Sequence, residues 1–236
     1  PFHVDPKLQK LFPDLPEADN IYAATLYHAD LRIGQLLDAL DEMKISDKTL
    51  VIFSSDNGPA RGSPNSPITL SYDSATGPGY GIGAAKGITG GRRAFKGALL
   101  EGGIGVPFIA RWPGKIAAGK VDKTSVLSAV DLLPTLCELG NVKLPKSYQS
   151  DGISQVSTLM GQGNKLRKKP IFWRMSAPWP ANQAKPDHWV AYAVVSEQWK
   201  LVLNKDQSHV ELFDLVDDPL ETSDLAAKNL ETVKRM

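Results

Sequence analysis

Two oxygen-bearing side chains stand together where an apolar stretch of the sequence ends. Residues 49–55 are rich in apolar side chains, and Asp56-Asn57-Gly58-Pro59 follows directly. The β-branched and aromatic residues of this run predict a strand, which Gly58-Pro59 ends. Because the run lacks clean alternation, we expect both faces of the strand to be covered, as in a parallel sheet flanked by helices. Asp56 and Asn57 would then lie at the carboxyl end of a buried strand, where open α/β sheets bind their ligands.

A carboxylate beside an amide oxygen suits a hard divalent cation such as Ca²⁺ or Mg²⁺. Asp56 and Asn57 are therefore candidate metal ligands. An ordinary turn explains the same residues, because Asp, Asn and Gly are common in turns. From this stretch alone, both interpretations stay open.

Three basic residues lie among glycines further along the chain. Arg92, Arg93 and Lys96 fall within the glycine-rich segment 90–105. Glycine lets the backbone approach a ligand closely, and Lys and Arg suit the oxygens of a sulfate or phosphate group. The three residues are candidate substrate contacts, and a solvated surface turn is the alternative.

The elements that would position these residues follow from the periodicity of the sequence. Apolar residues at spacings of three and four predict a helix over about 21–43, with Asp19 as its N-cap. Residues 106–110 predict a second buried strand, and Asp131 predicts the cap of a later helix. Residues 59–91 are rich in Gly, Pro and Ser, which favours either a substrate-facing lid or a surface insertion.

The character of the sequence changes after about residue 161. Short aromatic and β-branched stretches separated by turns predict a small antiparallel sheet, and residues 223–236 predict a C-terminal helix. We therefore predict an α/β protein with a core over 1–162 and a small subdomain over 163–236. The Trp-rich segment 173–180, with His188 and Trp189, is either a surface that stacks on a sugar or the core of the small sheet.

Composition excludes several classes of function. The chain has 236 residues, of which 42% are hydrophobic and 22% charged, and its net charge is +1. These values are typical of a soluble globular protein and argue against nucleic acid as a partner. No apolar run is long enough to span a membrane. Cys137 is the only cysteine, which excludes an intrachain disulfide; the sequence does not define an oligomeric state.

Four stretches, taken in order, resemble the sulfatase family of the alkaline phosphatase superfamily. They are Asp30-Leu-Arg-Ile-Gly34; Ser55-Asp-Asn-Gly58; Lys96-Gly-Ala-Leu-Leu-Glu-Gly-Gly-Ile-Gly-Val-Pro107 with Arg111-Trp-Pro-Gly114; and Asp131-Leu-Leu-Pro-Thr135. Trp199-Lys200 and residues 211–221 are similar to the closing segment of the family. The resemblance spans nearly the whole chain. It implies part of an alkaline-phosphatase-like sheet flanked by helices, and specifically the carboxyl-terminal half of an arylsulfatase or carbohydrate sulfatase.

The resemblance also implies roles for individual residues. Asp56 and Asn57 would supply two oxygen ligands to a divalent cation, usually Ca²⁺ in this family, with Mg²⁺ as the alternative. Lys96 would contact the sulfate and neutralise the leaving oxygen. Arg92, Arg93 and His188 are further candidate substrate contacts. The implied reaction is the hydrolysis of sulfate esters of small molecules or sugars.

The nucleophile of the family is a formylglycine made from the Cys of a Cys-x-Pro-x-Arg motif. Cys137 is followed by Glu138-Leu139-Gly140 and does not match that motif. We therefore expect the formylglycine and the other metal ligands upstream of residue 1, and we expect the chain alone to be inactive. The alternatives are a phosphoryl-transfer enzyme of the same superfamily and a noncatalytic binding module. The absence of Asn-x-Ser/Thr sequons, together with the habits of the family, favours a periplasmic or secreted bacterial protein.

Overall fold

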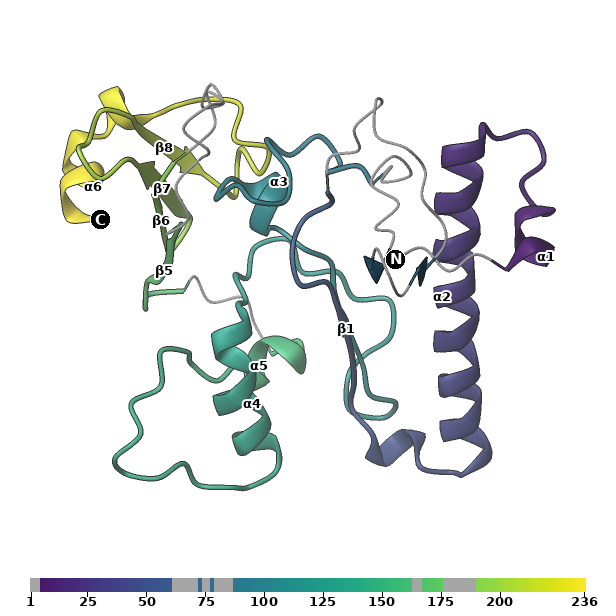
Figure 1. Ribbon diagram of the computed structural model, residues 1–236. Helices are drawn as coiled ribbons and strands as arrows, with labels where there is room; N and C mark the ends of the chain where they lie inside the picture. The colour runs from purple at the N-terminus through teal and green to yellow at the C-terminus, as the bar shows by residue number, and fades with distance from the viewer. Residues whose placement is uncertain (1–4, 61–71, 74–76, 79–86, 163–166, 176–189) are drawn as a thin grey trace.

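The computed structural model describes residues 5–60, 72–73, 77–78, 87–162, 167–175 and 190–236 (Figure 1). The helices are α1 (Pro6–Gln9), α2 (Glu17–Glu42), α3 (Glu101–Ile104), α4 (Leu132–Leu139), α5 (Val156–Leu159) and α6 (Leu230–Arg235). The strands are β1 (Val51–Ser54), β2 (Tyr72–Asp73), β3 (Gly77–Pro78), β4 (Phe108–Arg111), β5 (Ile171–Arg174), β6 (Tyr192–Ser196), β7 (Trp199–Leu203) and β8 (Val210–Asp214). In the described ranges, no helix combines the length and apolar character needed to cross a bilayer.

The strand that precedes Asp56 pairs with a later strand in the antiparallel sense. In β1 and β4, Val51 lies opposite Arg111 and Ser54 lies opposite Phe108. The prediction that β1 is a buried strand of a parallel sheet is therefore wrong for this pair. Phe53 is also 43% exposed. An apolar run specifies a strand with apolar faces, but it carries no information about the direction of the neighbouring strand.

The long helix α2 forms one side of the molecule (Figure 1). It begins at Glu17, so Asp19 lies in its first turn and is not the N-cap that the sequence predicted. An acidic side chain is also favourable there, because it faces the positive end of the helix dipole. Leu26 and Leu36 belong to the apolar residues whose spacing of three and four predicted this helix, yet they are 59% and 55% exposed. The buried residues of the helix are Ile21, Ala24 and Leu40.

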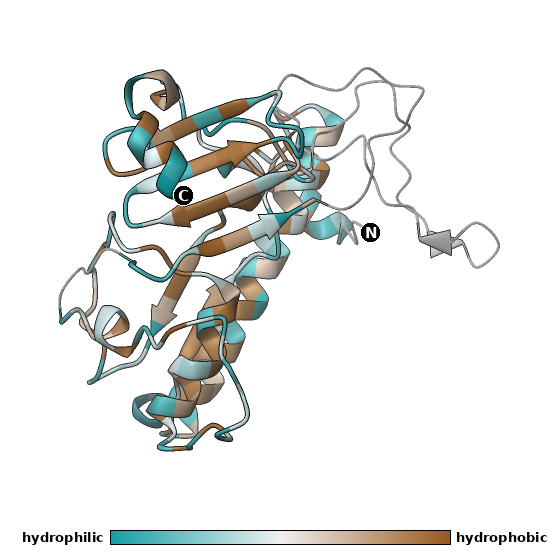
Figure 2. Ribbon diagram, turned by 90° about the vertical axis from the view of Figure 1, so that its left-hand side faces the viewer, coloured by the Kyte–Doolittle hydropathy of each residue, from teal (hydrophilic) through white to brown (hydrophobic). Residues whose placement is uncertain are grey.

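The four C-terminal strands form an antiparallel sheet in the order β5-β6-β7-β8. This confirms the predicted small sheet, whose strands carry many apolar residues in Figure 2. One face packs against Leu99 and Leu100, just before α3, in a cluster with Val190, Ala193, Val202 and Phe213. Trp173 packs against this cluster, which favours the core interpretation of that residue over sugar stacking.

The C-terminal helix is shorter than predicted. α6 begins only at Leu230, after the short 3-10 turn Ala226–Lys228. Asp224 holds the 3-10 turn, because its carboxylate accepts hydrogen bonds from the backbone N–H groups of Leu212 and Ala226, at 3.0 and 2.9 Å. Asn229 then interrupts the helix, since its φ and ψ angles of −131° and 49° are not helical.

Asp131 does not cap α4 with its side chain. Its carboxylate pairs with Arg167 at 2.7 Å, and the two side chains are 2% and 1% exposed. It also accepts hydrogen bonds from the backbone N–H groups of Ser128 and Ile153, both at 2.9 Å. This pair joins the two predicted domains across the proposed boundary, and the division at 162 stays a prediction.

Candidate functional site

The turn that carries Asp56 and Asn57 is bound to the segment that carries Lys96. The N–H of Gly58 donates to the carbonyl of Gly103 at 2.8 Å, and the N–H of Lys96 donates to the carbonyl of Pro59 at 3.0 Å. Figure 1 shows α3 between the upper end of β1 and the small sheet. The fold thus brings together the strand-end turn and the basic segment, which the sequence separates.

Glycines allow this close approach. A Cβ atom on Gly58 would lie 1.9 Å from the carbonyl oxygen of Gly102. A Cβ atom on Gly102 would in turn lie 2.2 Å from the carbonyl oxygen of Ala94 and 2.3 Å from that of Arg93. These neighbours are backbone atoms, so a larger residue would have to displace the chain itself. The glycines therefore fix how the turn, α3 and the Lys96 segment pack together.

Replacing Gly102 by alanine is expected to lower the free energy of unfolding of the complete protein by about 1–3 kcal/mol, the usual cost of overpacking. A chemical denaturation curve measures this change. Gly34→Ala is the matched control, because Gly34 lies within α2 with nothing within 4 Å of its Cβ position. The control is expected to stabilise the protein by about 0.5–1 kcal/mol. Equal midpoints for Gly102→Ala and the wild-type protein would contradict the packing described above.

The candidate metal ligands beside this packed backbone remain accessible to solvent. The side chain of Asp56 is exposed and that of Asn57 is half-buried. The Nδ2 group of Asn57 donates to the carbonyl of Gly58 at 2.9 Å, which holds the amide and leaves its Oδ1 atom as the acceptor. Lys96 is exposed as well. Two hard oxygen donors and one ammonium group are therefore available on neighbouring backbone segments.

These donors fit part of the coordination shell of a hard divalent cation. Ca²⁺ takes about six to eight oxygen ligands, and the turn offers the oxygens of Asp56 and Asn57. Within the described ranges, no group of three or more His, Cys, Asp and Glu side chains is arranged to hold a metal ion. A cation bound at the turn would therefore need oxygen ligands besides Asp56 and Asn57, such as backbone carbonyls, water or further carboxylates.

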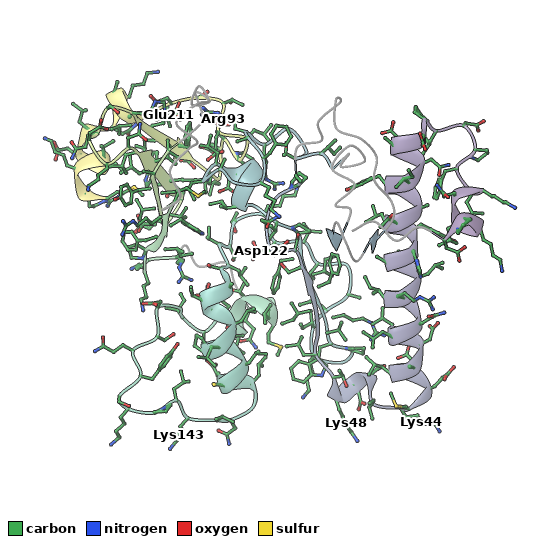
Figure 3. All side chains as sticks on the ribbon, viewed as in Figure 1. Lys44, Lys48, Arg93, Asp122, Lys143 and Glu211 are labelled. Atoms are coloured by element: carbon green, nitrogen blue, oxygen red, sulfur yellow. The ribbon has the colours of Figure 1, made fainter. Side chains whose placement is uncertain are left out.

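The other predicted substrate contacts have different positions. Arg93 lies beside Glu211 (Figure 3), with its Nη1 atom 3.2 Å from the Oε2 atom of that residue. Its guanidinium also lies over the ring of Phe213, 5.4 Å from the centroid. These contacts favour a structural role for Arg93, while a substrate contact stays a prediction. Arg92 is exposed, and His188 lies outside the described residues.

Sequence reasoning assigned neither burial nor a role to Lys200 and Glu221, two buried charged residues behind the site, although both lie in the stretches similar to the closing segment of the family. The alternation of side chains along Trp199–Leu203 could have predicted the burial of Lys200. Lys200 and Val202 lie on the same face of β7, because alternate residues of a strand share a face. The residues on either side of Lys200 in the sequence are apolar. The pattern therefore predicts a positively charged side chain on a face that the core covers.

Comparison with protein families decides which family the chain belongs to. The model of the family described as Sulfatase matches residues 2–142, more than half of the chain. The chain belongs to the sulfatase family. A second model, described as N-sulphoglucosamine sulphohydrolase, C-terminal, matches residues 93–235 of this sulfatase chain. The family in general uses a divalent metal ion and a formylglycine.

Curated relatives of this sulfatase chain include bacterial and human enzymes. A sulfatase of Formosa agariphila is 29% identical over 94% of the chain and 37% of its own length. An N-acetylgalactosamine-6-O-sulfatase of Bacteroides thetaiotaomicron is 26% identical over 88% of the chain and 38% of its own length. Human arylsulfatase A is 32% identical over 64% of the chain and 26% of its own length. The chain thus spans less than two fifths of the length of these relatives.

Solved structures confirm the fold class. The crystal structure of Ps i-CgsB in complex with k-i-k-neocarrahexaose matches the whole chain with a TM-score of 0.73 and 24% identity, over 45% of that structure. PsFucS1 sulfatase from Pseudoalteromonas sp. matches 98% of the chain with a TM-score of 0.64 and 24% identity, over 45% of that structure. The chain is therefore part of an alkaline-phosphatase-like α/β fold, followed by the small antiparallel sheet.

Proposed function

We propose that this chain supplies part of the active site of a complete protein that hydrolyses sulfate esters. In this proposal, Asp56 and Asn57 are two ligands of a divalent cation, Ca²⁺ in preference to Mg²⁺, and Lys96 contacts the sulfate. The observation that carries the proposal is the pair of backbone hydrogen bonds that joins the Asp56-Asn57 turn to the Lys96 segment and to Gly103. These two hydrogen bonds support a single site, in which a sulfate group would contact both the divalent cation and the Lys96 ammonium group.

The chemistry of sulfate ester hydrolysis assigns a task to each group. When bound, the cation supplies positive charge beside the sulfate oxygens. The Lys96 ammonium donates a hydrogen bond to the bridging ester oxygen, which gains negative charge as its bond to sulfur breaks. The carboxylate of Asp56 supplies the negative charge that holds the cation at the strand end, and the Asn57 amide adds a neutral oxygen.

The relatives support sulfated sugars as the substrate class. One relative is an N-acetylgalactosamine-6-O-sulfatase, and structural relatives were solved with k-i-k-neocarrahexaose and with D-glucosamine-2-N,6-O-disulfate. Human arylsulfatase A is a further relative. We propose a sulfated sugar as the natural substrate and an aryl sulfate as a useful assay substrate.

Parallel assays of the complete protein with an aryl sulfate, a sulfated sugar and an aryl phosphate test this proposal. The proposal predicts release of sulfate, and release of phosphate at a much lower kcat/KM. Faster release of phosphate would identify a phosphoryl-transfer enzyme of the same superfamily. Release of neither product would contradict the proposal.

The 236-residue chain on its own is expected to release no sulfate above background. Its Cys137 lies outside any Cys-x-Pro-x-Arg motif, so it has no formylglycine of the family type. Its Ca²⁺ affinity is expected to be weaker than about 10⁻⁴ M, because two protein ligands leave the ion largely hydrated. Titration calorimetry measures the affinity. Submicromolar binding, or turnover of an aryl sulfate, would contradict this division of the active site.

A further inference from the structure

A buried cluster of three charged side chains lies behind the Lys96 segment. Lys200 of β7 is fully buried, with its Nζ atom 2.8 Å from Oε1 of Glu101 and 2.8 Å from Oε1 of Glu221. The side chains of Glu101 and Glu221 are 19% and 0% exposed. Burying a charge is costly unless it is paired, so each member of the cluster depends on the others.

Glu221 is held in an unusual backbone conformation. Its φ angle is +58°, in the left-handed region that non-glycine residues rarely adopt. Burial raises the pKa of Glu221, and the Lys200 ammonium opposes that rise. A residue with a strained backbone and a buried charge persists only where its surroundings hold it in place, and such residues cluster at functional sites.

Glu221 binds both ends of the segment that carries Lys96. Its carboxylate accepts the backbone N–H of Glu101 at 2.8 Å. Its carbonyl oxygen accepts a hydrogen bond from Nη1 of Arg93 at 3.2 Å. Lys96 lies between these two residues in the chain, and the N–H of Gly102 closes the segment by donating to the carbonyl of Arg93 at 2.7 Å.

We propose that Glu221 and Lys200 are positioning residues for Lys96. Glu221 fixes the two ends of segment 93–101, and Lys200 fixes Glu221 and Glu101 against the small sheet. The ammonium group of Lys96 is thereby presented beside the Asp56-Asn57 turn. This inference rests on the proposed role of Lys96 in sulfate ester hydrolysis. In this proposal, the small antiparallel sheet helps to position Lys96 through Lys200.

Two substitutions of Glu221 in the complete protein test the proposal. Glu221→Ala removes the acceptor for the Glu101 N–H, whereas Glu221→Gln keeps a side-chain oxygen there. Glu221→Ala is expected to lower kcat by about 10- to 100-fold with KM nearly unchanged, because a small displacement of a reacting group has an effect of that size. Glu221→Gln is expected to retain kcat within about threefold of the wild-type value. Hydrogen exchange of the amides of 93–103 should speed up in Glu221→Ala and stay unchanged in Glu221→Gln.

Arg167→Met is the matched control, because it breaks an equally buried ion pair that lies outside segment 93–101. It is expected to lower Tm, while kcat of the folded protein and exchange in 93–103 stay unchanged. Arg93→Met is a second variant that releases the other end of the segment, and its side chain is 31% exposed. A fall in kcat at constant KM supports positioning, whereas a rise in KM at constant kcat would identify a substrate contact and overturn this part of the proposal.

Three results would overturn the proposal. They are unchanged exchange in Glu221→Ala, equal loss of kcat in Glu221→Ala and Glu221→Gln, and faster exchange of 93–103 in Arg167→Met. Failure of the proposed function is a separate result, because it appears as the absence of sulfate release by the wild-type complete protein. In that case the exchange measurement still decides whether Glu221 holds the segment.

Discussion

Replacing Lys96 by alanine in the complete protein is expected to lower kcat for sulfate ester hydrolysis by about 10²- to 10³-fold, the usual effect of removing one group that stabilises developing charge. The fold should tolerate the change, because Lys96 is exposed and takes part in no ion pair within the described ranges. The loss should come from charge left unstabilised on the departing oxygen. Steady-state rates with a series of aryl sulfates measure it.

The leaving group supplies an internal check on this prediction. Aryl sulfates with poor leaving groups carry more charge on the bridging oxygen, so they should lose more activity than those with good leaving groups. Lys143→Ala is the matched control, since Lys143 is an exposed lysine at the far end of the molecule (Figure 3). An equal loss for all leaving groups, or a loss below about threefold, would argue against the role of Lys96.

Replacing Asp131 by alanine is expected to lower the free energy of unfolding of the complete protein by about 3–5 kcal/mol, the usual effect of breaking a buried ion pair. Arg167 would be left buried without its partner, because its side chain is 1% exposed. The backbone N–H groups of Ser128 and Ile153 would also lose their acceptor. Urea denaturation followed by tryptophan fluorescence measures the change.

A surface pair is the control for this second prediction. Glu231 and Lys234 are 90% and 71% exposed and lie 3.0 Å apart. Glu231→Ala should therefore leave the unfolding midpoint essentially unchanged, because exposed ion pairs contribute little. If Asp131→Ala and Glu231→Ala have the same midpoint, the pair with Arg167 does not hold the two parts of the chain together.

Local signals in the sequence predicted most of the elements. The strands of the small sheet were predicted because their β-branched and aromatic residues are bounded by clear turns, and pairing between sequence neighbours needs no further information. Non-local features were harder to predict. The antiparallel pairing of β1 with β4 joins segments that the long stretch 59–91 separates, and an apolar run does not encode its partner. The interruption before α6 lies at Asn229, whose backbone is not helical, and local propensity did not predict it.

The candidate site was predicted through the ordered family pattern rather than through periodicity. Nothing in the composition of 90–105 places the backbone of Lys96 against that of Pro59. The physical cause is the contact of Gly58 with Gly102, which the sequence shows only as glycines. Arg93 and Lys96 are close in sequence and both basic, yet one pairs with Glu211 and the other is exposed. Only tertiary structure separates their environments.

The central claim is that the Asp56-Asn57 turn and Lys96 belong to one site for a cation and a sulfate group. The calcium dependence of sulfate release by the complete protein tests it most directly, measured for the wild type, Asp56→Ala and Lys96→Ala. We expect Asp56→Ala to raise the calcium concentration at half-maximal rate by about 10- to 100-fold, because the site loses a charged ligand. Lys96→Ala should lower the maximal rate and leave that concentration unchanged. An unchanged calcium dependence in Asp56→Ala would contradict the claim.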